Sequence, residues 1–220
     1  QTLDALIQNG EVKKARVQVL KLTHSKMPRT QRAELASVAR RVGLDELCVR
    51  ILYPVLHPPK GAPSTATEIE KAQYAIGLIR LGSVRAGLAI LKPLNASVYP
   101  QIHMFRGLGC LAEWDYVSAI PHFESGSVAQ GLSDYQKLVC RVNLSGCLVH
   151  ERRISEASKL LNHLLNETQS TYPVLRGNVL MYFAELMVET RDLKSAHEFI
   201  RKATELLPHL PSRDGLYVAK

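Results

Sequence analysis

The clearest pattern of apolar and polar positions is the stretch VLMYFAELMVETRDLKSAHEFIRKATELLP, residues 179–208. Apolar or small residues recur there at three- and four-residue spacing, as on one face of a helix: Leu180, Phe183, Ala184 and Met187 before the polar segment ETRDL, and Ala196, Ile200 and Ala203 after it. The pattern predicts a helix, a tight turn and a second helix that the final proline ends. Antiparallel helices cross closely where small side chains meet, so Ala184 and Ala196 are expected to face each other. Phe183 and Ile200 are expected to fill the space beside them.

The same register recurs along the chain. A small residue near the start of each expected second helix is followed four residues later by a larger apolar one, and successive sites lie about 30 to 40 positions apart. These small sites are Ala15, Cys48, Gly87, Ala119, Ala157 and Ala196. A glycine stands five residues before each of the first three, at Gly10, Gly43 and Gly82, where we expect a left-handed turn residue. Trp114 lies in the turn before Ala119, and we expect it to pack between hairpins.

This spacing resembles the tetratricopeptide repeat, whose pattern is W-x2-L-G-x2-Y…A-x3-F…P. In the last hairpin the pattern is met by Leu180, Phe183, Ala184, Met187, Ala196, Ile200 and Pro208. The resemblance implies an all-α fold, a right-handed α-solenoid of about six hairpins that stack because none can bury its apolar face alone. Approximate units are residues 1–28, 29–60, 68–97, 100–131, 138–169 and 177–208, within a single domain of residues 1–220.

The segment HPPKGAPSTAT, residues 57–67, predicts a loop between two of these units. Thr65 or Thr67, followed three residues later by Glu68 or Glu70, predicts a capping box at the start of the next helix. The chain begins at Gln1, without a methionine and inside an apolar periodic pattern, so we expect it to be a piece of a longer protein.

The resemblance also implies a binding surface, because the first helix of each tetratricopeptide hairpin turns side chains toward a concave groove. The expected groove residues are Ile76, Ile79, Met104, Phe105, Leu108, Leu111, Val142, Asn143, Met181 and Tyr182. An apolar groove of this kind favours an amphipathic helix or an extended apolar peptide. An acidic C-terminal peptide is not expected, because Asn143 lacks the paired lysine of a carboxylate clamp. A register shift of one residue would instead make this set ordinary core.

Basic residues concentrate near the amino terminus. The chain carries a formal charge of +8, and its first 50 residues hold twice as many lysines and arginines as aspartates and glutamates. The expected basic patch is formed by Arg29, Arg32, Arg40 and Arg41. Such a patch attracts phosphates or an acidic partner. Nucleic acid is the less favoured partner, because the sequence has no RGG-like or aromatic-interleaved basic segment and helical lysines and arginines more often form a solvated face.

Two sequence patterns resemble motifs of cofactor-binding or metal-binding sites. The motif GLGCLA, residues 107–112, fits a loose dinucleotide-binding pattern, but it is expected inside a continuous helix rather than after a strand. Cys140, Cys147 and His150 lie on neighbouring faces of one expected helix, yet seven residues separate the two thiols by about 10 Å, too far for one zinc ion. Without a nucleophile elbow, a zinc-protease motif or a phosphate-binding loop, we expect no enzymatic activity, no cofactor and no metal.

Composition restricts the setting. With 220 residues and 46% hydrophobic content the chain can bury a substantial core, and it has no apolar run of about 18 residues to insert into a membrane. Four scattered cysteines in apolar patterns favour a reducing, cytoplasmic compartment.

The leading hypothesis is a non-catalytic scaffold that binds a peptide or amphipathic helix of a protein partner in its groove. The alternatives are a sensor or regulatory domain of a larger signalling or transcription protein and, third, nucleic-acid binding through the basic amino-terminal units. Self-association through the groove or an uncapped end also remains open.

Overall fold

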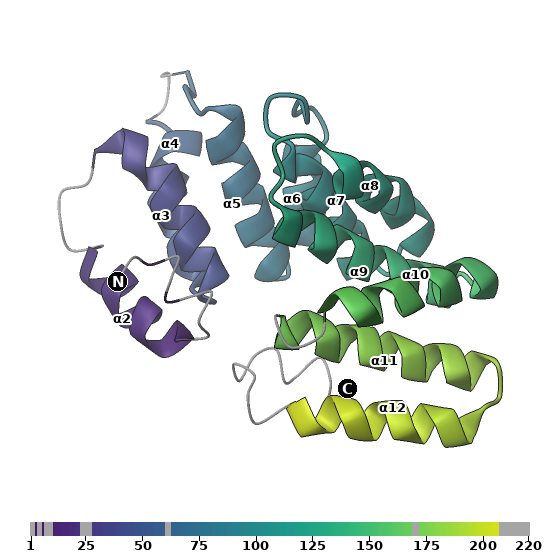
Figure 1. Cartoon of the computed structure of the whole chain (residues 1–220). Helices are drawn as coiled ribbons and strands as arrows, with labels where there is room; N and C mark the ends of the chain where they lie inside the picture. Colours follow the sequence, from purple (N-terminus) through teal and green to yellow (C-terminus); the bar gives the residue numbers. More distant parts are fainter. Residues whose placement is uncertain are drawn as a thin grey trace. The chain divides into compact units, whose positions relative to one another are not determined.

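The computed structural model describes residues 3, 6, 11–22, 28–59, 63–168 and 172–206. Within these ranges all regular structure is helical (Figure 1), as predicted. The helices are α2 (Val12–Leu22), α3 (Arg29–Arg41), α4 (Asp45–Leu56), α5 (Glu68–Arg80), α6 (Val84–Leu91), α7 (Gln101–Ala112), α8 (Tyr116–Val128), α9 (Asp134–His150), α10 (Ile154–Thr168), α11 (Pro173–Glu189) and α12 (Leu193–Leu206).

The chain divides into two compact units, Gln1–Glu113 and Trp114–Lys220. In the first unit α3 packs against α4 and α5 against α6, and the contacts α4–α5 and α6–α7 join successive hairpins. In the second unit α9 packs against α8 and α10, and α11 packs against α10 and α12. Helices that follow each other in sequence are therefore neighbours within each unit, as stacked helical hairpins require. We call α3, α5, α7, α9 and α11 the first helices, and the even-numbered ones the second helices.

The predicted small sites lie at equivalent places. Ala15, Cys48, Gly87, Ala119, Ala157 and Ala196 are all buried, and each is the fourth residue of its second helix. At Gly87 the approach is so close that a Cβ atom would lie 2.6 Å from the carbonyl oxygen of Ala75 in α5. The small side chain is thus a condition for the helix crossing.

In the last hairpin the structure confirms part of the predicted packing. Ala184 and Ala196 are buried, but Ile200 is 42% exposed, so the prediction that it fills the space beside them is wrong. Phe199 takes that role instead, because its ring stacks on Phe183 with centroids 4.7 Å apart.

The turns between first and second helices share one geometry. Each has a residue with positive φ five positions before the small site: Gly43, Gly82, Trp114, Arg152 and Arg191. At Arg191 the turn residue donates to the Val188 carbonyl, and the next amide donates to the Met187 carbonyl, a Schellman motif. The same bond pattern closes the turns at Gly43, Gly82 and Arg152. Gly10 lies outside the described residues. Trp114 is 77% exposed, so the prediction that it packs between hairpins is wrong.

The start of α5 has the predicted capping box. The Thr67 hydroxyl accepts from the Glu70 amide, and the Glu70 carboxylate accepts from the Thr67 amide. The motif therefore uses the second of the two threonines that the sequence offered.

Candidate functional site

Half of the predicted groove residues belong to the core. Ile76, Ile79, Met104, Phe105 and Val142 are between 0% and 7% exposed, so these side chains present almost no surface to a partner. The reason is the number of neighbours of a first helix. α5 packs against α3, α4, α6 and α7, and this leaves only a narrow strip of its circumference open. Sequence periodicity shows which positions are apolar but not how many helices surround them.

The other five predicted groove residues are partly accessible. Leu108 and Leu111 lie on α7, and Met181 and Tyr182 on α11, all half-buried. The Tyr182 ring packs so closely on α9 that a Cβ atom at Gly146 would lie 2.5 Å from it. Asn143 is also half-buried, and its amide donates to the carbonyl of Val139 in the same helix.

The predicted basic residues have different environments. The Arg29 guanidinium donates to Glu70 and to the hydroxyl and carbonyl of Thr65, so it joins α3 to the start of α5. Arg32 is half-buried and Arg41 is exposed. Arg40, at the end of α3, is half-buried and turns toward α5 and α7.

Arg40 is held by an aromatic ring and a buried amide. Its guanidinium carbon lies 5.2 Å from the centroid of the Phe105 ring, within the range of a cation–π contact. Its Nε donates to Gln73 Oε1 at 3.3 Å, and Gln73 Nε2 donates to the Tyr99 hydroxyl at 2.7 Å. Burial lowers the pKa of Arg40, and the neighbouring charges of Arg80 and Arg41 act in the same direction. An arginine nevertheless keeps its charge in proteins.

In the second unit, a histidine and a glutamate from neighbouring first helices lie close together. His150 Nε2 lies 3.5 Å from Glu185 Oε2, and the Tyr116 ring stacks on His150 with centroids 4.2 Å apart. Burial raises the pKa of Glu185, while His150 lowers it. Within the described ranges the buried Oε2 atom of Glu185 has no hydrogen-bond partner.

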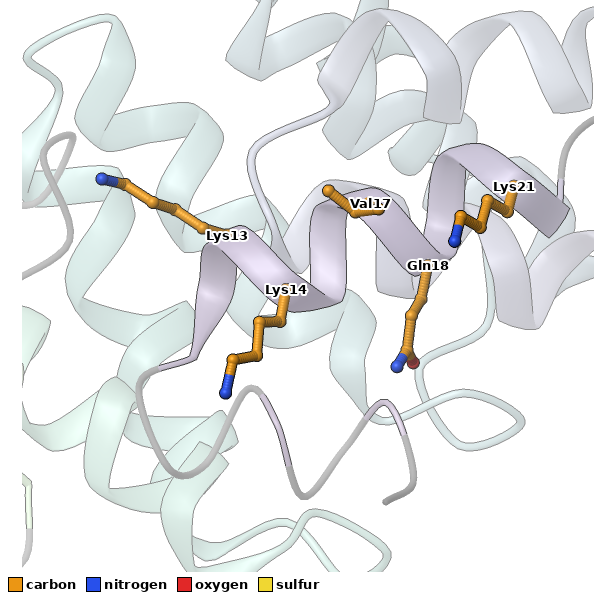
Figure 2. Close-up of a pocket in the computed structure, with 5 residues that line it drawn as sticks. All are labelled: Lys13, Lys14, Val17, Gln18 and Lys21. Atoms are coloured by element: carbon orange, nitrogen blue, oxygen red, sulfur yellow. The ribbon is translucent and has the colours of Figure 1, made fainter.

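A row of lysines on α2 was not singled out from the sequence. Lys13, Lys14, Val17, Gln18 and Lys21 line a shallow hollow of about 400 Å³ (Figure 2), opposite the buried Ala15 and Val19. Lys14 forms an ion pair with Glu11. The sequence does contain a signal for this surface. Lys13, Val17 and Lys21 are spaced four residues apart, which places all three on one helix face.

The two patterns that resemble cofactor-binding and metal-binding motifs have structural explanations. Gly107 and Gly109 are buried within the continuous helix α7, and within the described residues no strand precedes that helix. Cys140 and Cys147 are buried, and burial raises the pKa of Cys140 to about 12. Among the described residues there is no group of three or more His, Cys, Asp or Glu side chains that could hold a metal ion. Within those same ranges no helix is long and apolar enough to cross a membrane.

Comparisons with known proteins support the fold. No protein-family model and no curated protein sequence matches the chain significantly. Among solved structures, MamA labelled MSR-1 is similar over 81% of this chain and 93% of its own, with a TM-score of 0.58 and 19% identity. MamA from Desulfovibrio magneticus RS-1 (41 to the end) is similar over 82% of this chain and 98% of its own, with a TM-score of 0.56 and 17% identity.

A kinesin light chain of Podosopora anserina, described as having nearly identical TPR-like repeats, is similar over 80% of this chain and 93% of its own, with a TM-score of 0.57 and 15% identity. At these identities the likeness shows the fold alone. The fold is a tetratricopeptide-like helical repeat, as the sequence pattern predicts.

Proposed function

We propose that this chain is a non-catalytic protein-interaction module whose first helices hold a peptide or an amphipathic helix of a partner protein. The observation that carries the proposal is the pair Leu108 and Leu111 on α7. The two leucines are three residues apart, so they lie on one helix face, and both keep part of their surface accessible. A row of partly exposed apolar side chains suits the apolar face of a partner helix.

Two further features support the proposal. Met181 and Tyr182 present partly accessible surface on α11, a first helix of the second unit. Stacked helical repeats also provide extended surfaces on which many such proteins bind peptides. We further propose, as the sequence predicts, that residues 1–220 form one superhelical domain and that the protein works in the cytoplasm.

The proposal is tested with peptides selected by display on the immobilised protein. We expect Leu108→Asp to weaken the selected peptides about tenfold or more, because it places a charge on an apolar contact. Leu81→Asp is the matched control, since Leu81 is an exposed leucine in the turn after α5 of the same unit. Circular dichroism establishes that both variants fold. Equal affinity of wild type and folded Leu108→Asp for every selected peptide would rule out this surface.

The alternatives predict different results. A sensor or regulatory domain would bind a small ligand or peptide that changes the helix packing, and a DNA-binding or enzymatic domain joined to this chain would favour that role. Nucleic-acid binding would use the basic amino-terminal units, the α2 lysines among them, and would weaken steeply with salt. Substituting Lys13 and Lys21 by glutamine would then abolish binding, while Leu108→Asp would leave it unchanged.

A further inference from the structure

Arg40 is a half-buried cation with no carboxylate partner among the described residues. All of its hydrogen-bonding and ring contacts in the described residues are to Gln73 and Phe105, and both of these groups are neutral. Removing a cation from water is costly unless the cation is paired or hydrogen-bonded. At Arg40 a carboxylate counter-ion is missing from the described part of the chain.

The described acids around it have other partners. Asp45 Oδ1 lies 2.8 Å from Arg80 Nε, and Glu70 accepts from Arg29 and from Thr67. Further away, Glu68 accepts from the Asn95 amide, Glu113 pairs with Arg85 and Glu11 pairs with Lys14. The positive charges of Arg41 and Arg80 also lie near Arg40, so the charges next to it are not compensating ones.

The contacts of Arg40 also orient it. The guanidinium carbon lies over the Phe105 ring and Nε donates to Gln73, so the two Nη groups are the donors left without a partner among the described residues. Two parallel N–H groups on a fixed plane match the two oxygens of a carboxylate. Because the guanidinium is already held in one orientation, it loses little conformational entropy when a carboxylate binds, and this favours affinity.

We propose that Arg40 is the anchoring cation of the interaction surface and pairs with the side-chain carboxylate of an aspartate or glutamate on the bound peptide. This rests on the proposed function, because Phe105 lies one helical turn before Leu108 on α7. A partner helix seated on Leu108 and Leu111 could therefore reach Arg40 with an acidic residue. A carboxylate matches better than a phosphate, because its two oxygens pair with the two Nη groups on one plane, and the charge of neighbouring Arg80 is already engaged by Asp45.

Peptides selected on the wild-type protein provide the test. Replacing the acidic residue of a selected peptide by its amide is expected to weaken binding to wild type about tenfold or more, and to have no effect on binding to Arg40→Met. Arg50→Met is the matched control, because Arg50 is exposed on the second helix α4. Selected peptides that bind Arg40→Met as tightly as wild type, but lose affinity to Leu108→Asp, would overturn this inference and leave the proposed function standing.

Two further measurements keep the inference independent of peptide selection. In an NMR titration at constant ionic strength, the Arg40 Nε–H signal should shift with sodium acetate, saturably and more than the Arg50 signal. An equal response of the two arginines, or a response to inorganic phosphate alone, would overturn the inference. Arg40→Met should also fold and lose only a small part of its stability, since methionine keeps the contact with Phe105 and removes a desolvated charge but leaves the buried Gln73 oxygen without its donor. A clear loss of stability that Arg40→Lys restores would instead show that Arg40 holds the fold together.

Discussion

Replacing Gly87 by alanine tests the packing logic of the repeat, because local and tertiary effects have opposite signs there. Within an isolated helix, alanine is more favourable than glycine by about 1 kcal/mol. In this structure the added Cβ would lie 2.5 Å from Ile79 Cγ1 and 2.6 Å from the Ala75 carbonyl oxygen. Ordinary carbon contacts are about 3.5 to 4.0 Å, so α5 and α6 would have to separate by roughly 1 Å.

The magnitude follows from these two contributions. Overpacking of this kind costs about 1 to 3 kcal/mol, and the upper part of the range applies because one of the two contacts is to backbone. After the helical gain is subtracted, we expect Gly87→Ala to lower the free energy of unfolding by about 1 to 2 kcal/mol. The melting temperature should fall by about 2 to 4 °C for each kcal/mol.

Urea unfolding followed by circular dichroism measures this change, with Ala89→Gly as the matched control. Ala89 is exposed on the same helix, so its substitution reports the helical contribution without the contact. We expect both variants to be destabilised. If Gly87→Ala were more stable than wild type by about the amount that Ala89→Gly loses, the close crossing at Gly87 would be refuted.

Three other predictions concern turns, ion pairs and thiols. Arg191→Gly should stabilise the protein by about 0.5 to 1 kcal/mol in thermal unfolding, because glycine adopts the left-handed conformation without strain; a loss of stability would contradict this. Burial acts to raise the pKa of Glu70, but hydrogen bonds from Arg29 and Thr67 bring it below its ordinary value. Its contribution to stability should therefore be present above about pH 4.3 and be lost as the pH falls through the lower folded-state pKa. Glu70→Gln should show a shallower acid dependence of the urea midpoint, and an identical profile would exclude this role. A thiol reagent should modify half-buried Cys110 first, as mass spectrometry of the folded protein would show.

The register of small residues could be predicted because it depends on neighbours in sequence. Cys48, Gly87 and Ala157 each follow a turn by a fixed number of residues, and the turn and the crossing are formed within one hairpin. The left-handed turns at Arg152 and Arg191 were not predicted, because glycine was the only sequence signal for them. The structure shows that hairpin packing imposes this conformation on arginine as well.

The candidate site was predictable only in part. Phe105 was expected to face a partner, and the structure places it under Arg40, which was expected to be a surface charge. Both differences arise because side chains from α3 and α7 meet across α5. Such a meeting depends on contacts between hairpins, and a periodic pattern within one helix contains no information about it.

The exposed position of Trp114 has a practical consequence. It is the single tryptophan of the chain, and its ring lies 6.4 Å from that of Tyr116, at the start of the second unit. Its fluorescence should be red-shifted and easily quenched by iodide in the unbound protein. A partner that covers this turn would shift the emission to the blue, so the native chain carries its own optical reporter of binding at one defined place.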